Sequence, residues 1–234
     1  MFKKSISIVT LLILALLSIM PINKAMADVM SVEELKHFKN VFLEKDDSVV
    51  EKWKKPVRIF VTVDERYRNF VIDVVKMLDE TSNLKIELTN DSVNCVVVFT
   101  DNFYKEAFAN GERYFSGFLK SGEDFVRYFA EFARKDDYVR KFIRYGLGDD
   151  HNIYSVFSMI EISLADEDRA KKIIFKTILE ILFGSSEFKF NYDTAFDRRN
   201  SRLTLTEQDQ SIIKALYSDQ ITPGMGISEI GELK

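Results

Sequence analysis

The chain has 234 residues, of which 46% are hydrophobic and 30% are charged, and its formal net charge at pH 7 is −4. This composition is typical of a folded globular protein, and a mildly acidic balance without a basic tail argues against nucleic acid as a partner. Because Cys95 is the only cysteine, the chain has no intramolecular disulfide.

The N-terminal segment has the pattern of a secretory signal peptide. Two lysines near the start precede an apolar run over residues 6–20, and an Ala-x-Ala motif ends at Ala27. We therefore expect residues 1–27 to be a signal peptide that is cleaved between Ala27 and Asp28. The apolar run is shorter than the about 20 residues that span a bilayer, and an uncleaved anchor is the alternative.

Cleavage would leave a mature chain of 207 residues, in which the loss of three lysines gives 30 basic and 37 acidic side chains and a formal charge of −7. No cysteine lies near the cleavage position, which argues against a lipid anchor. No later stretch is long and apolar enough for a membrane span, so we expect no transmembrane segment after cleavage. The protein is predicted to be periplasmic or secreted.

The length of the mature chain favours one domain with a sizeable core, and three prolines and nine glycines leave no obvious linker. We predict an N-terminal helical appendage over residues 28–52 and a single α+β domain over residues 53–234. Within the appendage, Ser31 and Glu34 have the spacing of a capping box, which predicts a helix that runs to about Leu43.

The first half of the domain is predicted to form a small mixed sheet. Residues 57–63 alternate and are rich in β-branched side chains, which indicates a first strand. Residues 67–80 carry apolar side chains at helical spacing. Short strands are expected at residues 84–88 and 95–99. The order strand, helix, strand, strand predicts a mixed sheet with a helix packed on one face.

The second half is predicted to be more helical. A capping-box pattern at Ser121 precedes aromatic side chains at helical spacing over residues 125–132, which form either the core face of a helix or the lining of a ligand groove. A strand is expected over residues 154–164. Asp166 is then predicted to cap a strongly apolar helix that runs to Phe183.

On a helical wheel of this apolar helix, Lys176, Thr177 and Glu180 lie opposite a broad apolar arc. We therefore predict that the helix packs against the sheet and that Glu180 forms a solvated ion pair with Lys176, one turn earlier. A last helix is predicted to open at Thr206 and to run through Tyr217.

Histidine is scarce, since His37 and His151 are the only two, and neither belongs to a His-Glu-x-x-His motif. A standard zincin site is therefore excluded. Asp149, Asp150 and His151 are the candidate metal ligands, although adjacent residues rarely converge on one ion, and a polar loop before the next strand is the alternative. No catalytic residue and no cofactor are predicted.

Other reactive groups have plainer interpretations. A thiolate is disfavoured in an apolar strand, so Cys95 is predicted to be a small buried side chain rather than a nucleophile assisted by His151. Gly146 and Gly148 lack the third glycine of a phosphate-binding loop and are expected to follow a helix. The charged loop around Asp197 is predicted to be a solvated connection, with an anion-binding loop as the alternative.

Three segments have a distinctive sequence, namely residues 53–58, residues 94–99 and, most strongly, residues 216–225 (Leu-Tyr-Ser-Asp-Gln-Ile-Thr-Pro-Gly-Met). They resemble a proteobacterial family of exported proteins and predicted lipoproteins, a domain of unknown function. The resemblance implies an α+β fold with a zincin-like core and supplies no reaction. The family's central helix carries a Glu-x-x-Gln motif, and the corresponding positions here are Ile178 and Ile181.

We therefore expect a non-catalytic module of the cell envelope that binds an unknown protein or envelope component through exposed aromatic and charged loops. One alternative is a divergent metal-dependent hydrolase, in which Asp149, Asp150 and His151 converge on a cleft. The other is a structural subunit of an envelope assembly, which would expose a large apolar patch. The sequence leaves open whether the segment from about residue 103 to residue 150 covers a cleft.

Overall fold

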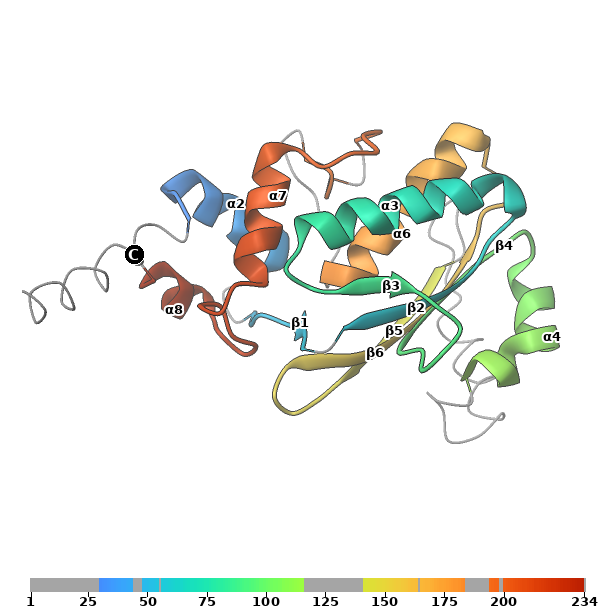
Figure 1. Ribbon diagram of the computed structural model, residues 1–234, viewed down its shortest axis with the longest axis horizontal. Helices are drawn as coiled ribbons and strands as arrows, with labels where there is room; N and C mark the ends of the chain where they lie inside the picture. The colour runs from blue at the N-terminus through green and yellow to red at the C-terminus, as the bar shows by residue number, and fades with distance from the viewer. Residues whose placement is uncertain are drawn as a thin grey trace, which may run out of the picture.

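The computed structural model describes residues 30–43, 48–54, 56–115, 141–163, 165–183, 194–197 and 200–233. Within this part of the chain, a six-stranded sheet is combined with helices (Figure 1). The predicted signal peptide, with Ala27 and Asp28, lies outside the described residues, and so does the helix expected to begin at Ser121. None of the helices described is long and apolar enough to cross a membrane.

The strands are β1 (Lys52–Trp53), β2 (Val57–Thr62), β3 (Ile86–Leu88), β4 (Cys95–Thr100), β5 (Lys141–Leu147) and β6 (Asn152–Glu161). Neighbouring strands follow the order β1, β6, β4, β2, β3, and β5 also pairs with β6. The pairs along this order are parallel, whereas β5 and β6 form an antiparallel hairpin. The sheet as a whole is mixed, but the prediction of a mixed sheet in the first half is wrong, because β2, β3 and β4 pair in parallel and the antiparallel pair lies in the second half.

The helices are α2 (Val32–Phe42), α3 (Arg68–Thr81), α4 (Phe103–Phe115), α6 (Glu167–Phe183), α7 (Glu207–Leu216) and α8 (Ile227–Gly231), and a 3-10 turn spans Glu65–Tyr67. Helices α2 and α7 begin at the predicted capping boxes, where the hydroxyls of Ser31 and Thr206 accept backbone N–H groups. Helix α6 begins beside Asp166, which accepts the backbone N–H of Arg169. The prediction that α7 is the last helix is wrong, because α8 follows it.

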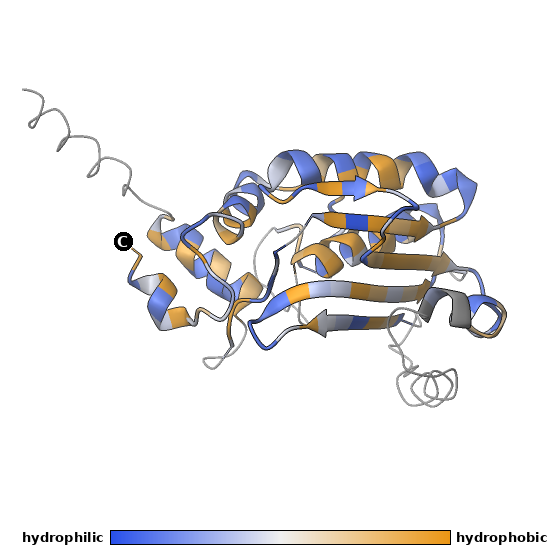
Figure 2. Cartoon of the chain, turned by 60° about the horizontal axis from the view of Figure 1, so that its bottom comes forward, coloured by the Kyte–Doolittle hydropathy of each residue, from blue (hydrophilic) through white to orange (hydrophobic). Residues whose placement is uncertain are grey.

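Alternate side chains of β4 enter two separate hydrophobic clusters. Cys95 and Val97 pack with residues of α3 and α6, whereas Val96 and Val98 pack with Phe103 and other residues of the opposite cluster. Because successive side chains of a strand point to opposite faces, α3 and α6 cover one face of the sheet and α4 lies on the other (Figure 1). The strands between them are mostly apolar (Figure 2).

Helix α2 is part of the main core. Phe38 and Val41 are 0% and 1% exposed and belong to the same cluster as the residues of α3 and α6. The ring of Phe42 contacts the ring of Phe196 at 5.8 Å between centroids. The segment predicted as an N-terminal appendage is therefore packed into the domain.

Lys52, which immediately precedes the distinctive segment of residues 53–58, contacts the distinctive segment of residues 216–225. The ammonium group of Lys52 donates hydrogen bonds to the carbonyls of Leu216 (3.1 Å), Ser218 (3.3 Å) and Ile221, at the carboxyl end of α7. A cation is favourable at this end of a helix because the last carbonyls have no partner within it. The adjacent Trp53 indole donates to a carbonyl of α6 at 3.1 Å. Lys52 and Trp53 thus connect β1 to the carboxyl end of α7 and to α6.

Strand β5 differs from the prediction, which placed a helix before Gly146 and Gly148. Gly146 lies within β5 and is paired with Ser155 of β6. A side chain has no room there, since a Cβ at Gly146 would lie 2.3 Å from the Ser155 hydroxyl oxygen. The expectation that these glycines follow a helix is therefore wrong.

Candidate functional site

The candidate metal ligands Asp149, Asp150 and His151 form the turn of the β5–β6 hairpin, and all three are exposed. The carboxylate of Asp150 accepts hydrogen bonds from the Tyr154 hydroxyl, at 2.9 Å, and from the side-chain amide of Asn152. The bond from Tyr154, followed by those from Asn152, lowers the pKa of Asp150. Asp150 is thus engaged within its own hairpin.

His151 contacts a different part of the molecule. Its backbone is left-handed, with φ at 57°, and its ring lies so close to the C-terminal turn that a Cβ at Gly224 would be 3.2 Å from it. His151 also acts electrostatically on Glu51, whose pKa is raised by burial and lowered to a smaller extent by His151. His151 and Asp150 therefore do not converge. Across the described ranges, no group of three or more His, Cys, Asp or Glu side chains is arranged to hold a metal ion.

The positions of α6 that correspond to the family motif lie in the core. Ile178 is 1% exposed and Ile181 is 0% exposed, and both belong to the main hydrophobic cluster. Thr177 is 3% exposed, so its predicted place on a polar helix side is wrong. The helix is more deeply buried than an isolated helical wheel indicates, because the 194–197 segment and Tyr217 also contact it.

Glu180 does not pair with Lys176. It forms an ion pair with Lys141 of β5, and the two side chains are only 16% and 22% exposed. The Tyr145 hydroxyl, also from β5, donates to the backbone carbonyl of Glu180 at 3.0 Å. The predicted solvated pair is therefore wrong, because the strand that supplies the real partner was not predicted. The pair joins the hairpin to α6.

Cys95 is buried, as predicted. Its side chain is 0% exposed in the centre of β4, and burial raises the pKa of the thiol far above its usual range. A protonated thiol is a poor nucleophile. The prediction of a small buried side chain is confirmed.

A buried polar centre surrounds Asp209, which the sequence predicts only as a capping residue. Its side chain is 0% exposed. One carboxylate oxygen accepts from the Thr194 hydroxyl and lies 3.2 Å from Nε2 of His37, while the other accepts the backbone N–H groups of Ala195 and Thr206, each at 2.9 Å. Asp209 therefore links α2, the 194–197 segment and the start of α7.

These hydrogen-bond donors stabilise the charged form of Asp209. Burial alone would raise the pKa of Asp209, but the hydrogen bonds from His37 and Thr194 and from the two backbone amides outweigh it, so the pKa lies below its usual value. A carboxylate surrounded by donors and removed from solvent suits a structural role better than proton transfer to a substrate. The sequence carries no signal for this centre, because His37 and Asp209 are 172 residues apart.

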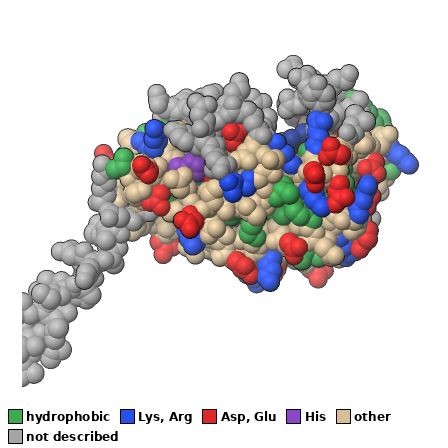
Figure 3. Space-filling view, turned by 90° about the horizontal axis from the view of Figure 1, so that it is seen from above, with side chains coloured by type: hydrophobic (Ala, Val, Ile, Leu, Met, Phe, Trp, Pro, Cys, Tyr) green, Lys and Arg blue, Asp and Glu red, His purple; other side chains and the backbone are tan. Residues whose placement is uncertain are grey.

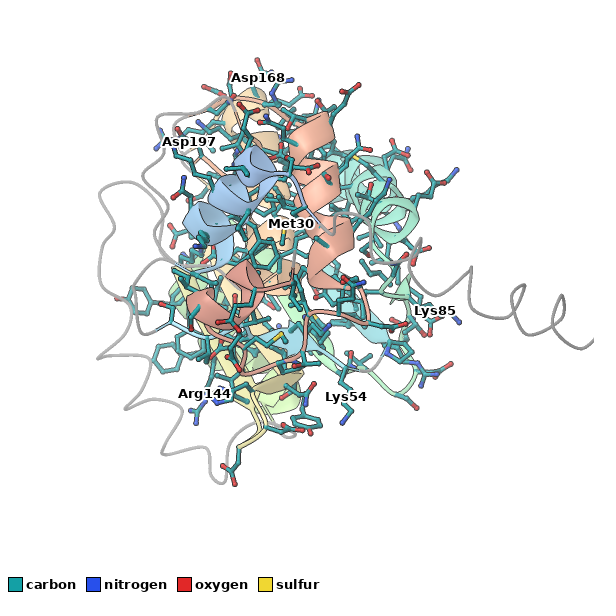
Figure 4. All side chains as sticks on the ribbon, turned by 90° about the vertical axis from the view of Figure 1, so that its left-hand side faces the viewer. Met30, Lys54, Lys85, Arg144, Asp168 and Asp197 are labelled. Atoms are coloured by element: carbon teal, nitrogen blue, oxygen red, sulfur yellow. The ribbon has the colours of Figure 1, made fainter. Side chains whose placement is uncertain are left out.

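Lys176 lies beside the same centre. It donates a hydrogen bond to the carbonyl of Ala195. Burial, and to a smaller extent the charge of Lys172, lowers the pKa of Lys176 to about 8. Asp197, near α2 in Figure 4, is 5% exposed. The prediction that the loop around Asp197 is a solvated connection is therefore wrong for this residue.

The carboxyl ends of β2 and β4 form a second polar region. These strands are neighbours, but β2 leads through α3 to β3 on one side, and β4 leads through α4 toward β6 on the other. Their loops diverge at this point, where ligands of open parallel sheets commonly bind. The hairpin of residues 149–151 precedes β6 and therefore lies at the opposite end of the sheet (Figure 1).

Charged and aromatic side chains are exposed at this end. Asp64 accepts the backbone N–H of Arg66 at 3.0 Å and pairs with its guanidinium at 3.2 Å. The charge of Asp101 also acts on Arg66. On the outer side of α4, Tyr104 is 43% exposed and Phe108 is 75% exposed. We refer to Asp64, Arg66, Asp101, Tyr104 and Phe108 as the carboxyl edge.

Glu161 fixes the position of α4 at this edge. Its carboxylate accepts the backbone N–H of Phe103 at 3.2 Å and the Ser163 hydroxyl at 3.1 Å. Phe103 itself is fully buried beneath the first turn of α4. The outward direction of Tyr104 and Phe108 follows from this anchoring, since both lie about 100° around the helix from the buried Phe103 and Ala107.

Comparisons of the chain with protein-family models, with curated proteins and with solved structures find no match. The resemblance to a family of exported proteins therefore stays a prediction. What the protein does has to be argued from its own residues.

Proposed function

We propose that the protein is an exported, non-catalytic binding module of the cell envelope, with residues 1–27 as its signal peptide. The observation that carries this proposal is the exposure of Tyr104 and Phe108 on α4, which follows β4 at the same edge of the sheet as the loop of Arg66. Aromatic side chains and arginine are the residue types that anchor protein interfaces most often. An aromatic ring that is 75% exposed on a helix gains from being covered by a partner.

The arrangement around α6 supports the non-catalytic part of the proposal. Zinc peptidases of the His-Glu-x-x-His type carry two histidine ligands and the catalytic glutamate on one helix. If the protein has a zincin-like core, α6 is that helix, because it follows β6 and packs on the sheet. The three positions are then Thr177, Ile178 and Ile181, all of them buried. Two isoleucines supply neither a ligand nor a base.

The alternatives have less support. A metal-dependent hydrolase would need Asp149, Asp150 and His151 around one ion, but Asp150 and His151 contact different parts of the molecule. A structural subunit would expose a broad apolar surface. Among the residues that the structure describes, the exposed large apolar side chains are instead distributed over several elements, namely Val32, Ile72, Leu88, Tyr104, Phe108, Leu147 and Tyr154.

Site-specific crosslinking in intact cells tests the proposal. A photoreactive phenylalanine analogue would be placed at position 108 in one variant and at position 32 in another. These positions are matched, since Phe108 is 75% exposed and Val32 is 76% exposed, and they lie at opposite ends of the molecule (Figure 1). We expect a discrete adduct with an envelope protein from position 108 alone. Equal or absent adducts from both positions would contradict the proposed binding surface.

A further inference from the structure

Acidic side chains outnumber basic ones around the carboxyl edge. The loops and first helical turns at this end span residues 64–68, 101–106 and 161–171. They contain eight acidic and five basic residues, namely Asp64, Glu65, Asp101, Glu106, Glu161, Asp166, Glu167 and Asp168 against Arg66, Arg68, Lys105, Arg169 and Lys171. Figure 3 shows acidic side chains, with basic ones among them, at the right-hand end of the molecule, where α3 and α6 begin.

Some of these acids are already neutralised. Ion pairs join Asp64 to Arg66 and Glu65 to Arg68, each at 3.2 Å, and Glu167 to Lys171 at 2.5 Å. Asp101 and Asp168 are exposed and form no ion pair within the described part of the chain. The side chain of Asp168 points outward from the end of α6 (Figure 4).

Arg66 connects the two groups of acids. Its guanidinium interacts electrostatically with Asp101, and its charge also acts on Glu167 in the first turn of α6. Thr100 pairs with Glu161 where the neighbouring parallel strands β4 and β6 end, so Asp101, which follows β4, and the acids at the start of α6, which follows β6, lie at the same edge of the sheet. Asp101 comes just before α4, two residues ahead of its first residue, whereas Tyr104 and Phe108, four residues apart, lie on one side of the helix.

We propose that the carboxyl edge binds a cationic amphipathic segment of a partner protein, with the apolar side chains of that segment on Tyr104 and Phe108 and its lysines or arginines beside Asp101 and Asp168. This inference rests on the proposed function and adds the chemistry of the partner. A cationic segment complements the excess of carboxylates and also interacts favourably with exposed aromatic rings.

Binding of two synthetic peptides tests this inference. One peptide alternates lysine and leucine, the other alternates glutamate and leucine, and fluorescence anisotropy reports the affinity of each for the purified mature protein. We expect the lysine peptide to bind at least about tenfold more tightly at low ionic strength, and the difference to shrink as salt screens the charges. Equal affinities, or preference for the glutamate peptide, would overturn the inference.

Matched variants distinguish binding at the carboxyl edge from nonspecific attraction of a cationic peptide to an acidic protein. Asp101→Asn and Asp149→Asn remove the same charge at opposite ends of the sheet. Asp101→Asn should weaken binding of the lysine peptide about threefold and Asp149→Asn should leave it unchanged. Likewise Phe108→Ala should weaken it about fivefold or more, and Val32→Ala should not. Equal effects within either pair would contradict the assignment, provided that thermal melting shows all four variants folded.

The two experiments fail separately. If crosslinking from position 108 yields a discrete envelope adduct but the peptides are not distinguished by charge, the inference about the partner is wrong and the proposed function stands. If neither position yields an adduct but the lysine peptide binds at the carboxyl edge with the expected variant pattern, the surface assignment stands and the envelope role is wrong.

Discussion

Nε2 of His37 and Oδ1 of Asp209 lie 3.2 Å apart in a buried contact between α2 and α7. The contact joins residues that are 172 positions apart. Asp209 is also bonded to Thr194, Ala195 and the start of its own helix. Three segments therefore depend on one carboxylate, and its removal should loosen all of them.

We expect Asp209→Ala to lower the free energy of unfolding by about 3 kcal/mol or more, because it leaves several buried donors without an acceptor. Urea denaturation followed by circular dichroism measures this. Glu207→Ala is the control, because Glu207 is exposed although it lies in the same first turn of α7. This substitution should cost no more than about 0.5 kcal/mol. Similar losses in the two variants would show that the buried bonds to Asp209 contribute little.

The lowered pKa of Asp209 predicts how stability depends on acid. A carboxyl group whose folded pKa is below its unfolded value stabilises the protein above the unfolded pKa of about 4, and that contribution is lost as the pH falls through the folded pKa. The free energy of unfolding should therefore fall more steeply below about pH 4 in the wild type than in Asp209→Asn. Parallel pH profiles would contradict this contribution.

Lys176 predicts a second rise of stability with pH, on the alkaline side. Its pKa of about 8 in the folded protein lies below the about 10.4 of an unfolded lysine. Between these values the unfolded chain binds more protons, so stability should rise with pH across this window. Lys176→Met should flatten the rise, whereas Lys76→Met, at an exposed position of α3, should not. Denaturation series at pH 7 to 10 check both variants.

His151 has a left-handed backbone at φ 57°, which is strained for a side chain other than glycine. We expect His151→Gly to raise the free energy of unfolding by about 0.5–1 kcal/mol, since relief of the strain exceeds the entropic cost of glycine. His151→Ala loses the ring and keeps the strain, so it should not be stabilising. Thermal melting measures the stability of both variants. A higher melting temperature for His151→Ala than for His151→Gly would contradict this prediction.

Metal content offers a direct test of the hydrolase alternative. We expect residues 28–234, purified without chelator or metal-affinity resin, to contain no stoichiometric transition metal by mass spectrometry, because the described residues bring no group of three His, Cys, Asp or Glu side chains together around one ion. A bound transition metal in a one-to-one ratio would contradict the non-catalytic proposal. The triple variant of Asp149, Asp150 and His151 to alanine would then show whether the hairpin holds it.

Several features of the fold follow from local sequence. The capping boxes at Ser31 and Thr206, the apolar periodicity of α6 and the burial of Cys95 are all as predicted. Strand β2 also begins at the predicted position, residue 57. Each depends on side chains within a few positions of one another, so short-range patterns suffice.

The candidate site is harder to predict from the sequence than these elements are. Residues 149–151 stand together in the chain, but the turn directs Asp150 into its own hairpin and His151 toward Gly224. The carboxyl edge has no continuous motif, since Asp64, Asp101 and Phe108 come from separate segments. They meet only because β2 and β4 are neighbours in a parallel sheet whose connections diverge.

By itself the sequence determined the kind and approximate position of most secondary elements and the burial of the single thiol. Only the tertiary structure decided which distant charges pair, as in Lys141 with Glu180 and His37 with Asp209. The physical reason is that capping and amphipathic periodicity act over one or two helical turns. Ion pairs and buried hydrogen bonds between distant residues depend instead on the order of the strands and the packing of whole helices.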